Sequence, residues 1–136
     1  MKEAIRHGVI IAIDPGTKET GIVVYAPVSQ SVDWMGILPN PELRDMLVGV
    51  NQGCIAIEMI ASYGMPVGRE VFETCVWIGR LIEACSLPPD RCRKVYRRQV
   101  KQQVCSSPRA KDGNVRQAII DRYPRSGGGK TPQIGT

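Results

Sequence analysis

The segment IIAIDPGTKETGIVVY, residues 10–25, restricts the possible folds of this chain more than any other segment. Two apolar runs, residues 8–14 and 21–26, are separated only by PGTKET, which predicts two antiparallel strands joined by a tight loop. The first run ends on a lone carboxylate, Asp14, directly before a Pro-Gly turn. Because an unpaired charge is costly to bury, either the strand ends at a binding site or Asp14 only caps the turn.

Periodicity along the rest of the chain predicts alternating strands and helices, in the order βββαβαβαα. Short apolar runs predict the other strands: residues 31–37, 54–58 and 92–96. Helical spacing predicts four helices: residues 41–48 with Asn40 as the N-cap, 66–87 opening at Pro66, 97–104 and 112–122. The alternation predicts an α/β fold.

The apolar spacing also predicts which helix faces are buried. In the long helix, one stripe follows the helical repeat: Val67, Val71, Cys75, Ile78, Ile82 and Cys85. A second set widens this stripe, as expected for a helix packed on a sheet: Phe72, Val76 and Leu81. In the last helix, the side chains expected to be buried are Val115, Ala118 and Ile119.

Charge is distributed unevenly along the chain. Residues 91–136 carry twelve Lys or Arg against two Asp, a net charge of +10, whereas the first ninety residues have a net charge of −5. This asymmetry favours a polyanionic partner at the basic end, although a charged run can also be only a solvated face.

Length and composition limit the classes of protein to consider. The 136 residues, 43% of them hydrophobic, fit one globular domain with a modest core. No segment has the roughly 18–20 consecutive apolar residues of a membrane span, and MKEAIRHG lacks the apolar region of a signal peptide. We therefore expect a cytoplasmic protein without a membrane partner. The five cysteines form no C-x-x-C pair and mostly lie in apolar runs, which predicts reduced core thiols.

A second strand-end carboxylate repeats the pattern of Asp14. The run CIAIE ends on Glu58. If the two strands are neighbours, both carboxylates meet at one sheet edge, and two carboxylates so close cannot both stay ionised without a cation. Oxygen ligands select Mg²⁺ or Mn²⁺, and such ions clamp the attacking water and leaving oxygen in phosphodiester hydrolysis. The alternative is that each acid is a solvated strand-end residue.

Three segments resemble one family. IIAIDPGTKETGIVVY is similar to the first motif of the RuvC-type Holliday junction resolvases, in the ribonuclease H-like superfamily, and residues 54–81 are similar to their second block. RRQVKQQV and KDGNVRQAIIDRYP resemble the region before the last motif, most closely in phage-type members. The resemblance implies an α/β fold with a ribonuclease H-like mixed sheet (βββαβαβα) flanked by helices, as a single nuclease domain over residues 1–124.

The resemblance also implies a metal site and its ligands. Asp14 would be the first ligand and Glu58 the second, with Mg²⁺ or Mn²⁺ as cofactor and two ions in the complete site. Family members end with a helix carrying further acids, and this sequence contains no such helix; after residue 90 its only acids are Asp112, at an N-cap position, and Asp121. Residues 125–136 are expected to be a flexible Gly-rich tail before a missing helix, so the activity of the 136 residues stays open.

The implied partner is branched DNA, above all a four-way junction. A two-fold homodimer would cut its two symmetry-related strands, with the helix around Val76 and Trp77 as either the interface or part of the core. Tyr63 would stack on an unpaired base or be a plain surface aromatic. The basic residues expected to contact phosphates, with Lys101 matching a family position near the substrate, are Arg97, Arg98, Lys101, Arg109, Lys111 and Arg116.

Other functions remain as alternatives. A non-catalytic nucleic-acid-binding domain would keep the fold without the last acids, and an RNA-processing nuclease would belong to the same superfamily. The D-x-G-T pattern also resembles the phosphate loop of actin-like ATPases and sugar kinases, but 136 residues leave no room for the second domain that these need. GGGKT, residues 127–131, lacks the first glycine and the strand–helix context of a P-loop.

Overall fold

A computed structural model describes residues 1–123 of the chain. The chain forms two compact units, Met1–Val95 and Tyr96–Thr136, and each is described by itself. The single nuclease domain expected over residues 1–124 stays a prediction. The expected Gly-rich tail, residues 125–136, and the GGGKT segment lie outside the described residues.

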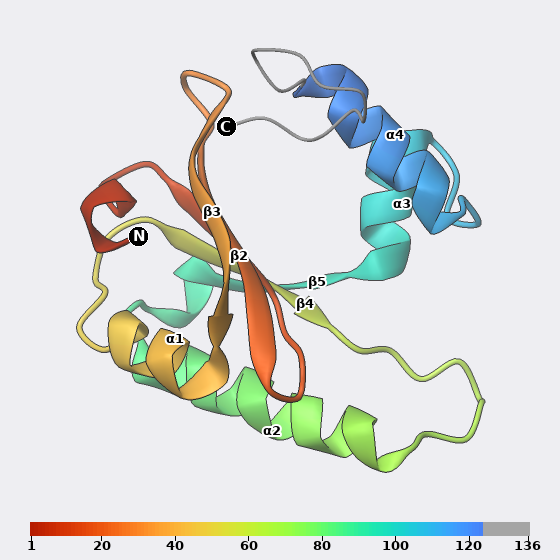
Figure 1. Ribbon diagram of the computed structural model, residues 1–136, viewed down its shortest axis with the longest axis horizontal. Coiled ribbons are helices and arrows are strands. Elements are labelled where there is room, and N and C mark those ends of the chain that lie inside the picture. The colour runs from red at the N-terminus through yellow and green to blue at the C-terminus, as the bar shows by residue number, and fades with distance from the viewer. Residues whose placement is uncertain (124–136) are drawn as a thin grey trace. The chain divides into compact units, whose positions relative to one another are not determined.

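The centre of the fold is a five-stranded sheet with the strand order β3-β2-β1-β4-β5 (Figure 1). Its strands are β1 (Ile10–Asp14), β2 (Glu19–Ala26), β3 (Ser31–Pro39), β4 (Cys54–Met59) and β5 (Cys92–Tyr96). The first three strands pair antiparallel as hairpins, whereas β1 and β4 pair in parallel. A parallel pair requires a crossover connection, which the chain between β3 and β4 supplies. The sheet is therefore mixed, as expected.

Two helices, α1 (Asn40–Leu47) and α2 (Arg69–Ala84), pack against one face of this sheet (Figure 1). Short 3₁₀ turns, η1 (Lys2–Ala4) and η2 (Pro89–Arg91), complete the unit. The core combines alternate strand residues with one stripe of each helix: Ile11, Ile13, Ile22, Ile55, Ile57, Leu43, Leu47, Ile78 and Leu81. One face of the sheet is thus buried under the two helices. The strand residues that alternate with the core residues point to the opposite face.

Helix α2 differs from the prediction in its start and in its buried face. It begins at Arg69 rather than Pro66, after an extended Gly68, so Val67 is not helical, and it ends at Ala84 rather than at residue 87. The buried positions are Thr74, Ile78 and Leu81. Residues three or four apart share a helix face. The prediction that Phe72 and Val76 widen the buried stripe was wrong, because these two residues lie on a different face of α2. They are 62% and 54% exposed.

The second unit contains α3 (Arg97–Cys105) and α4 (Asp112–Arg122). The backbone N–H of Tyr96 donates to the Gln99 side chain at 2.9 Å, which closes the start of α3. In α4 the buried residue is Ile120, one position beyond the predicted set, whose members are half-buried. No helix within residues 1–123 is long and apolar enough to cross a membrane.

Candidate functional site

Asp14 and Glu58 occupy neighbouring positions on two adjacent strands. In the parallel pairing of β1 with β4, Ile13 lies beside Ile57, and each carboxylate is the next residue along its strand. Neighbouring strands are about 4.8 Å apart. The structure therefore brings together the two acids that the sequence singled out.

Both carboxylates belong to the sheet face opposite the core. Side chains alternate along a strand, and Ile13 and Ile57 are buried in the core, so the following residues face the other way. Asp14 is exposed and Glu58 is half-buried. Solvent therefore reaches both carboxylates on this face of the sheet. Metal-assisted hydrolysis requires such access, because water and substrate must reach the metal ligands.

The positions around the two acids are occupied by small residues. Ala12 and Ala56 precede the acids on the same face by two residues. Gly21 pairs with Asp14 across β1 and β2, and a Cβ built there would contact the Asp14 Cβ at 3.7 Å. Small residues thus stand next to both carboxylates on this face of the sheet.

The loop after Asp14 is held by a buried polar network that the sequence analysis missed. Thr20 Oγ1 donates to Asn40 Oδ1 at 2.6 Å, and Asn40 Nδ2 donates to the carbonyl of Gly16 at 2.9 Å. The backbone N–H of Asn40 donates to the carbonyl of Lys18, also at 2.9 Å. The prediction of Asn40 as an N-cap was wrong: it is the first helical residue, and its side chain bonds to the loop instead of to α1.

The donor set fits a hard divalent cation. Two carboxylates, completed by water and by substrate phosphate oxygens, suit Mg²⁺, which keeps several waters when it binds to proteins. Within residues 1–123, however, no group of three or more His, Cys, Asp or Glu side chains gathers into a metal-binding cluster. Asp14 and Glu58 are thus a pair, and a second ion would need further ligands.

The six basic residues assigned to phosphate contact all lie in the second unit. Arg97, Arg98 and Lys101 belong to α3, Arg116 belongs to α4, and Arg109 and Lys111 lie between the two helices. All are exposed except Lys101, which is half-buried. We refer to these six residues as the basic surface at α3–α4, and their contact with phosphates stays a prediction.

Asp112 interrupts this basic surface. Its Oδ1 lies 2.8 Å from Arg97 Nη2 and 3.2 Å from Lys101 Nζ. The hydrogen bonds from Arg97 and then Lys101 lower the pKa of the Asp112 carboxyl below its ordinary value. Asp112 was expected at an N-cap, but that position is Lys111, and the Asp112 side chain bridges α3 and α4 instead.

Tyr63 lies in the segment between β4 and α2, five residues after Glu58, and is 65% exposed. Met65 in the same segment is also exposed. The exposed ring is compatible with either reading from the sequence, base stacking or a plain surface aromatic. Its role stays a prediction.

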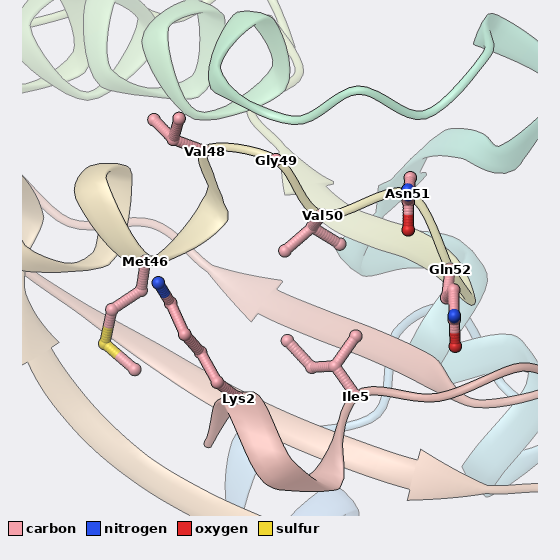
Figure 2. A pocket seen from close by; sticks show the side chains of 8 residues that line it. All are labelled: Lys2, Ile5, Met46, Val48, Gly49, Val50, Asn51 and Gln52. Carbon is pink, nitrogen blue, oxygen red and sulfur yellow. The ribbon is translucent and has the colours of Figure 1, made fainter.

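A shallow pocket of about 270 Å³ lies elsewhere in the first unit (Figure 2). Its lining comes from η1 and from the chain around the end of α1 and the approach to β4: Lys2, Ile5, Met46, Val48, Gly49, Val50, Asn51 and Gln52. These residues precede β4, whereas Glu58 lies near its other end. The pocket contains one charged side chain, Lys2, and no acid, so it offers no carboxylate ligand for a metal ion.

No protein-family model matches the chain, and no curated protein matches it significantly. Solved structures do match. Thermus thermophilus RuvC superposes with a TM-score of 0.63 at 16% identity, covering 83% of this chain and 78% of that one. The chain has the fold of RuvC. A second structure, T. thermophilus RuvC in complex with a Holliday junction substrate, gives a TM-score of 0.64 at 15% identity and covers 85% and 79%.

The likeness to RuvC confirms the ribonuclease H-like α/β architecture predicted from the sequence. At 15–16% identity it concerns the fold alone. The closeness to phage-type members stays a prediction.

Proposed function

We propose that this protein is a divalent-metal-dependent endonuclease that cuts branched DNA, in the manner of a Holliday junction resolvase. The observation that supports this most is the placement of Asp14 and Glu58 side by side on adjacent parallel strands of a RuvC fold. A RuvC structure in complex with a Holliday junction substrate supports the choice of substrate class. We propose a cytoplasmic place of action.

Asp14 and Glu58 would hold the metal ion. When bound, Mg²⁺ or Mn²⁺ supplies an activated water and stabilises the leaving oxygen of the phosphodiester. The small residues beside the acids, Ala12, Ala56 and Gly21, would let the scissile phosphate approach. The pair provides ligands for one ion, and we propose that a second ion of a complete site takes its remaining ligands from other acids.

The basic surface at α3–α4 would bind the DNA backbone. Contacts to phosphates carry no sequence information, so selectivity would come from the shape of the junction. Because each neutralised phosphate releases counterions, binding should weaken steeply with salt. Tyr63 would stack on an unpaired base near the branch point.

We propose that the protein acts as a two-fold homodimer, because a junction presents two symmetry-related strands to be cut. Phe72 and Val76, one turn apart on α2, are large apolar side chains that the first unit leaves exposed. They belong to the helix predicted as an interface and are the first candidates for the contact.

A binding-only role is the second candidate function. It is favoured by one observation: the described residues gather no third acid beside Asp14 and Glu58. An incomplete ligand set should reduce the rate of hydrolysis strongly while leaving the basic surface intact.

Cleavage of a labelled four-way junction and a matched linear duplex, with Mg²⁺ or Mn²⁺, separates these candidates. The proposal predicts symmetric nicks in the junction that Asp14→Asn abolishes and that Asp45→Asn, at an exposed position on α1, leaves unchanged. Selective junction binding without cleavage would establish the binding-only role. Equal affinity for junction and duplex would contradict both.

A further inference from the structure

We infer that Asn40 is a positioning residue for Asp14, acting through the loop of residues 15–18 that follows this carboxylate. The inference rests on the proposed function, in which Asp14 is a metal ligand. It assigns a role to a buried side chain on α1, whose contacts are to the loop next to the site.

The side-chain oxygen, the side-chain amide N–H and the backbone N–H of Asn40 all make hydrogen bonds. Its side chain is fully buried, accepts from the Thr20 hydroxyl and donates to the Gly16 carbonyl, and its backbone N–H donates to the Lys18 carbonyl. Burying a polar amide is unfavourable unless its groups are paired. Both loop carbonyls that Asn40 meets lie within four residues of Asp14.

The Asn40 side chain makes its hydrogen bonds outside α1. An Asn at the start of a helix ordinarily stabilises it by accepting a bond from a backbone N–H of the first turn. Here the side chain makes no capping bond, and α1 begins without a side-chain cap. Asn40 is the first helical residue rather than the cap, and its oxygen accepts from Thr20 while its amide N–H donates to Gly16, so these bonds hold the loop rather than α1.

The strand pairing beside the loop ends at Asp14. The β1–β4 ladder pairs residues up to Ile13, and Asp14 is paired only with Gly21 of β2. Gly16 passes so close to the backbone of Glu19 that a Cβ there would clash. A tight turn of this kind has few conformations, and the two bonds from Asn40 select one. Removal of a group that bonds directly to a metal ligand typically costs about 10–100-fold in metal affinity, and we expect the low end of this range because Asn40 acts through the loop and not on Asp14 itself.

Two variants distinguish positioning from plain stability. Asn40→Ala removes the bond to Gly16, whereas Thr20→Val removes a bond of the same buried network and keeps the Asn40–Gly16 bond. If Asn40→Ala does not give folded protein, Asn40→Ser replaces it, because a serine hydroxyl can still meet Thr20 but lacks the amide that reaches Gly16. Both variants are expected to lower the thermal midpoint.

The experiment measures Mn²⁺ dissociation constants by calorimetry, well below each midpoint, and amide hydrogen exchange of Gly16–Lys18 without metal. We expect about tenfold weaker Mn²⁺ binding and faster loop exchange in Asn40→Ala, with less than about a twofold change in affinity in Thr20→Val. Wild-type affinity in a folded Asn40→Ala would overturn the inference alone. If wild type and Asp14→Asn bind Mn²⁺ equally, the proposed function fails, and the inference fails with it.

Discussion

Lys101 Nζ lies 3.2 Å from Oδ1 of Asp112, and Arg97 reaches the same oxygen at 2.8 Å. One carboxylate thus joins two cations of α3 to the start of α4. All three side chains are at least partly exposed, so the ion pairs contribute little to stability on their own. Their main consequence is that two cations of the basic surface are already paired before any nucleic acid arrives.

The first prediction concerns the pH dependence of these ion pairs. The pKa of Asp112 is lowered in the folded protein from its ordinary 3.8, because Arg97 and Lys101 favour the charged form. The stabilisation is therefore fully present above pH 3.8 and is lost as the pH falls through the lowered pKa. Thermal midpoints of wild type and Asp112→Asn should differ at pH 6 and converge in strong acid. A constant difference at all pH values would contradict this.

The second prediction concerns DNA affinity. Asp112→Asn removes a negative charge from the basic surface and the ion pair that holds Lys101, so we expect tighter junction binding at low salt and a steeper salt dependence. The control is Asp121→Asn on the same helix, where the carboxylate accepts from Gln117. Fluorescence titrations at several salt concentrations give both quantities. Equal gains in the two variants would indicate only a net-charge effect.

The third prediction concerns Cys92. Burial and then the neighbouring Cys85, whose sulfur lies 3.7 Å away, raise the pKa of the Cys92 thiol from 9.0 to about 11. Since thiolate is the reactive form, but a thiolate of higher pKa is also more nucleophilic, Cys92 should react with iodoacetamide at pH 8 roughly tenfold more slowly than a thiol of ordinary pKa. Mass spectrometry after timed labelling measures this, with the exposed Cys54 as internal reference. Labelling of Cys92 as fast as Cys54 would contradict the prediction.

The raised pKa of Cys92 also affects stability in alkali. The folded state favours the protonated thiol, so the contribution is present below pH 9 and is lost as the pH rises towards about 11. Cys92→Ala should therefore reduce the drop in thermal midpoint across this window.

The fourth prediction contrasts two neighbours on α2. Ile78 is 3% exposed in the core, so Ile78→Ala should lower the free energy of unfolding by about 2–5 kcal/mol. Val76 is 54% exposed, so Val76→Arg should leave stability nearly unchanged but disrupt the proposed homodimer. Chemical denaturation and sedimentation velocity measure the two effects. A dimeric Val76→Arg protein would place the interface elsewhere.

Most of the fold could be predicted from sequence because its strands are short apolar runs bounded by turns. The strand 92–96 and the helix 112–122 have the predicted bounds, and the order of elements agrees with the prediction. The errors concern the ends of α1 and α2 and the buried helix faces. Phe72 and Val76 follow an apolar spacing that periodicity alone cannot distinguish from a core stripe, and only the packing of Thr74 and Ile78 decides the phase.

The candidate site was predictable to a lesser extent. Asp14 and Glu58 could be predicted as site residues because each is a carboxylate at the end of an apolar run. The end of a strand is where a buried sheet meets solvent. Asn40 was misread since an Asn before a helix is usually its cap, and nothing local indicates a partner as distant along the chain as Gly16. A buried polar network depends on tertiary contacts, which no short motif contains.

The central question is whether Asp14 and Glu58 hold the same ion. Mn²⁺ dissociation constants for Asp14→Asn, Glu58→Gln and the double variant address it directly, with Asp45→Asn as a charge-matched control. Two ligands of one ion are strongly coupled, so each single variant should lose at least about tenfold in affinity and the double variant should lose little more. Wild-type affinity in either single variant, or losses that simply multiply in the double variant, would contradict a shared metal site.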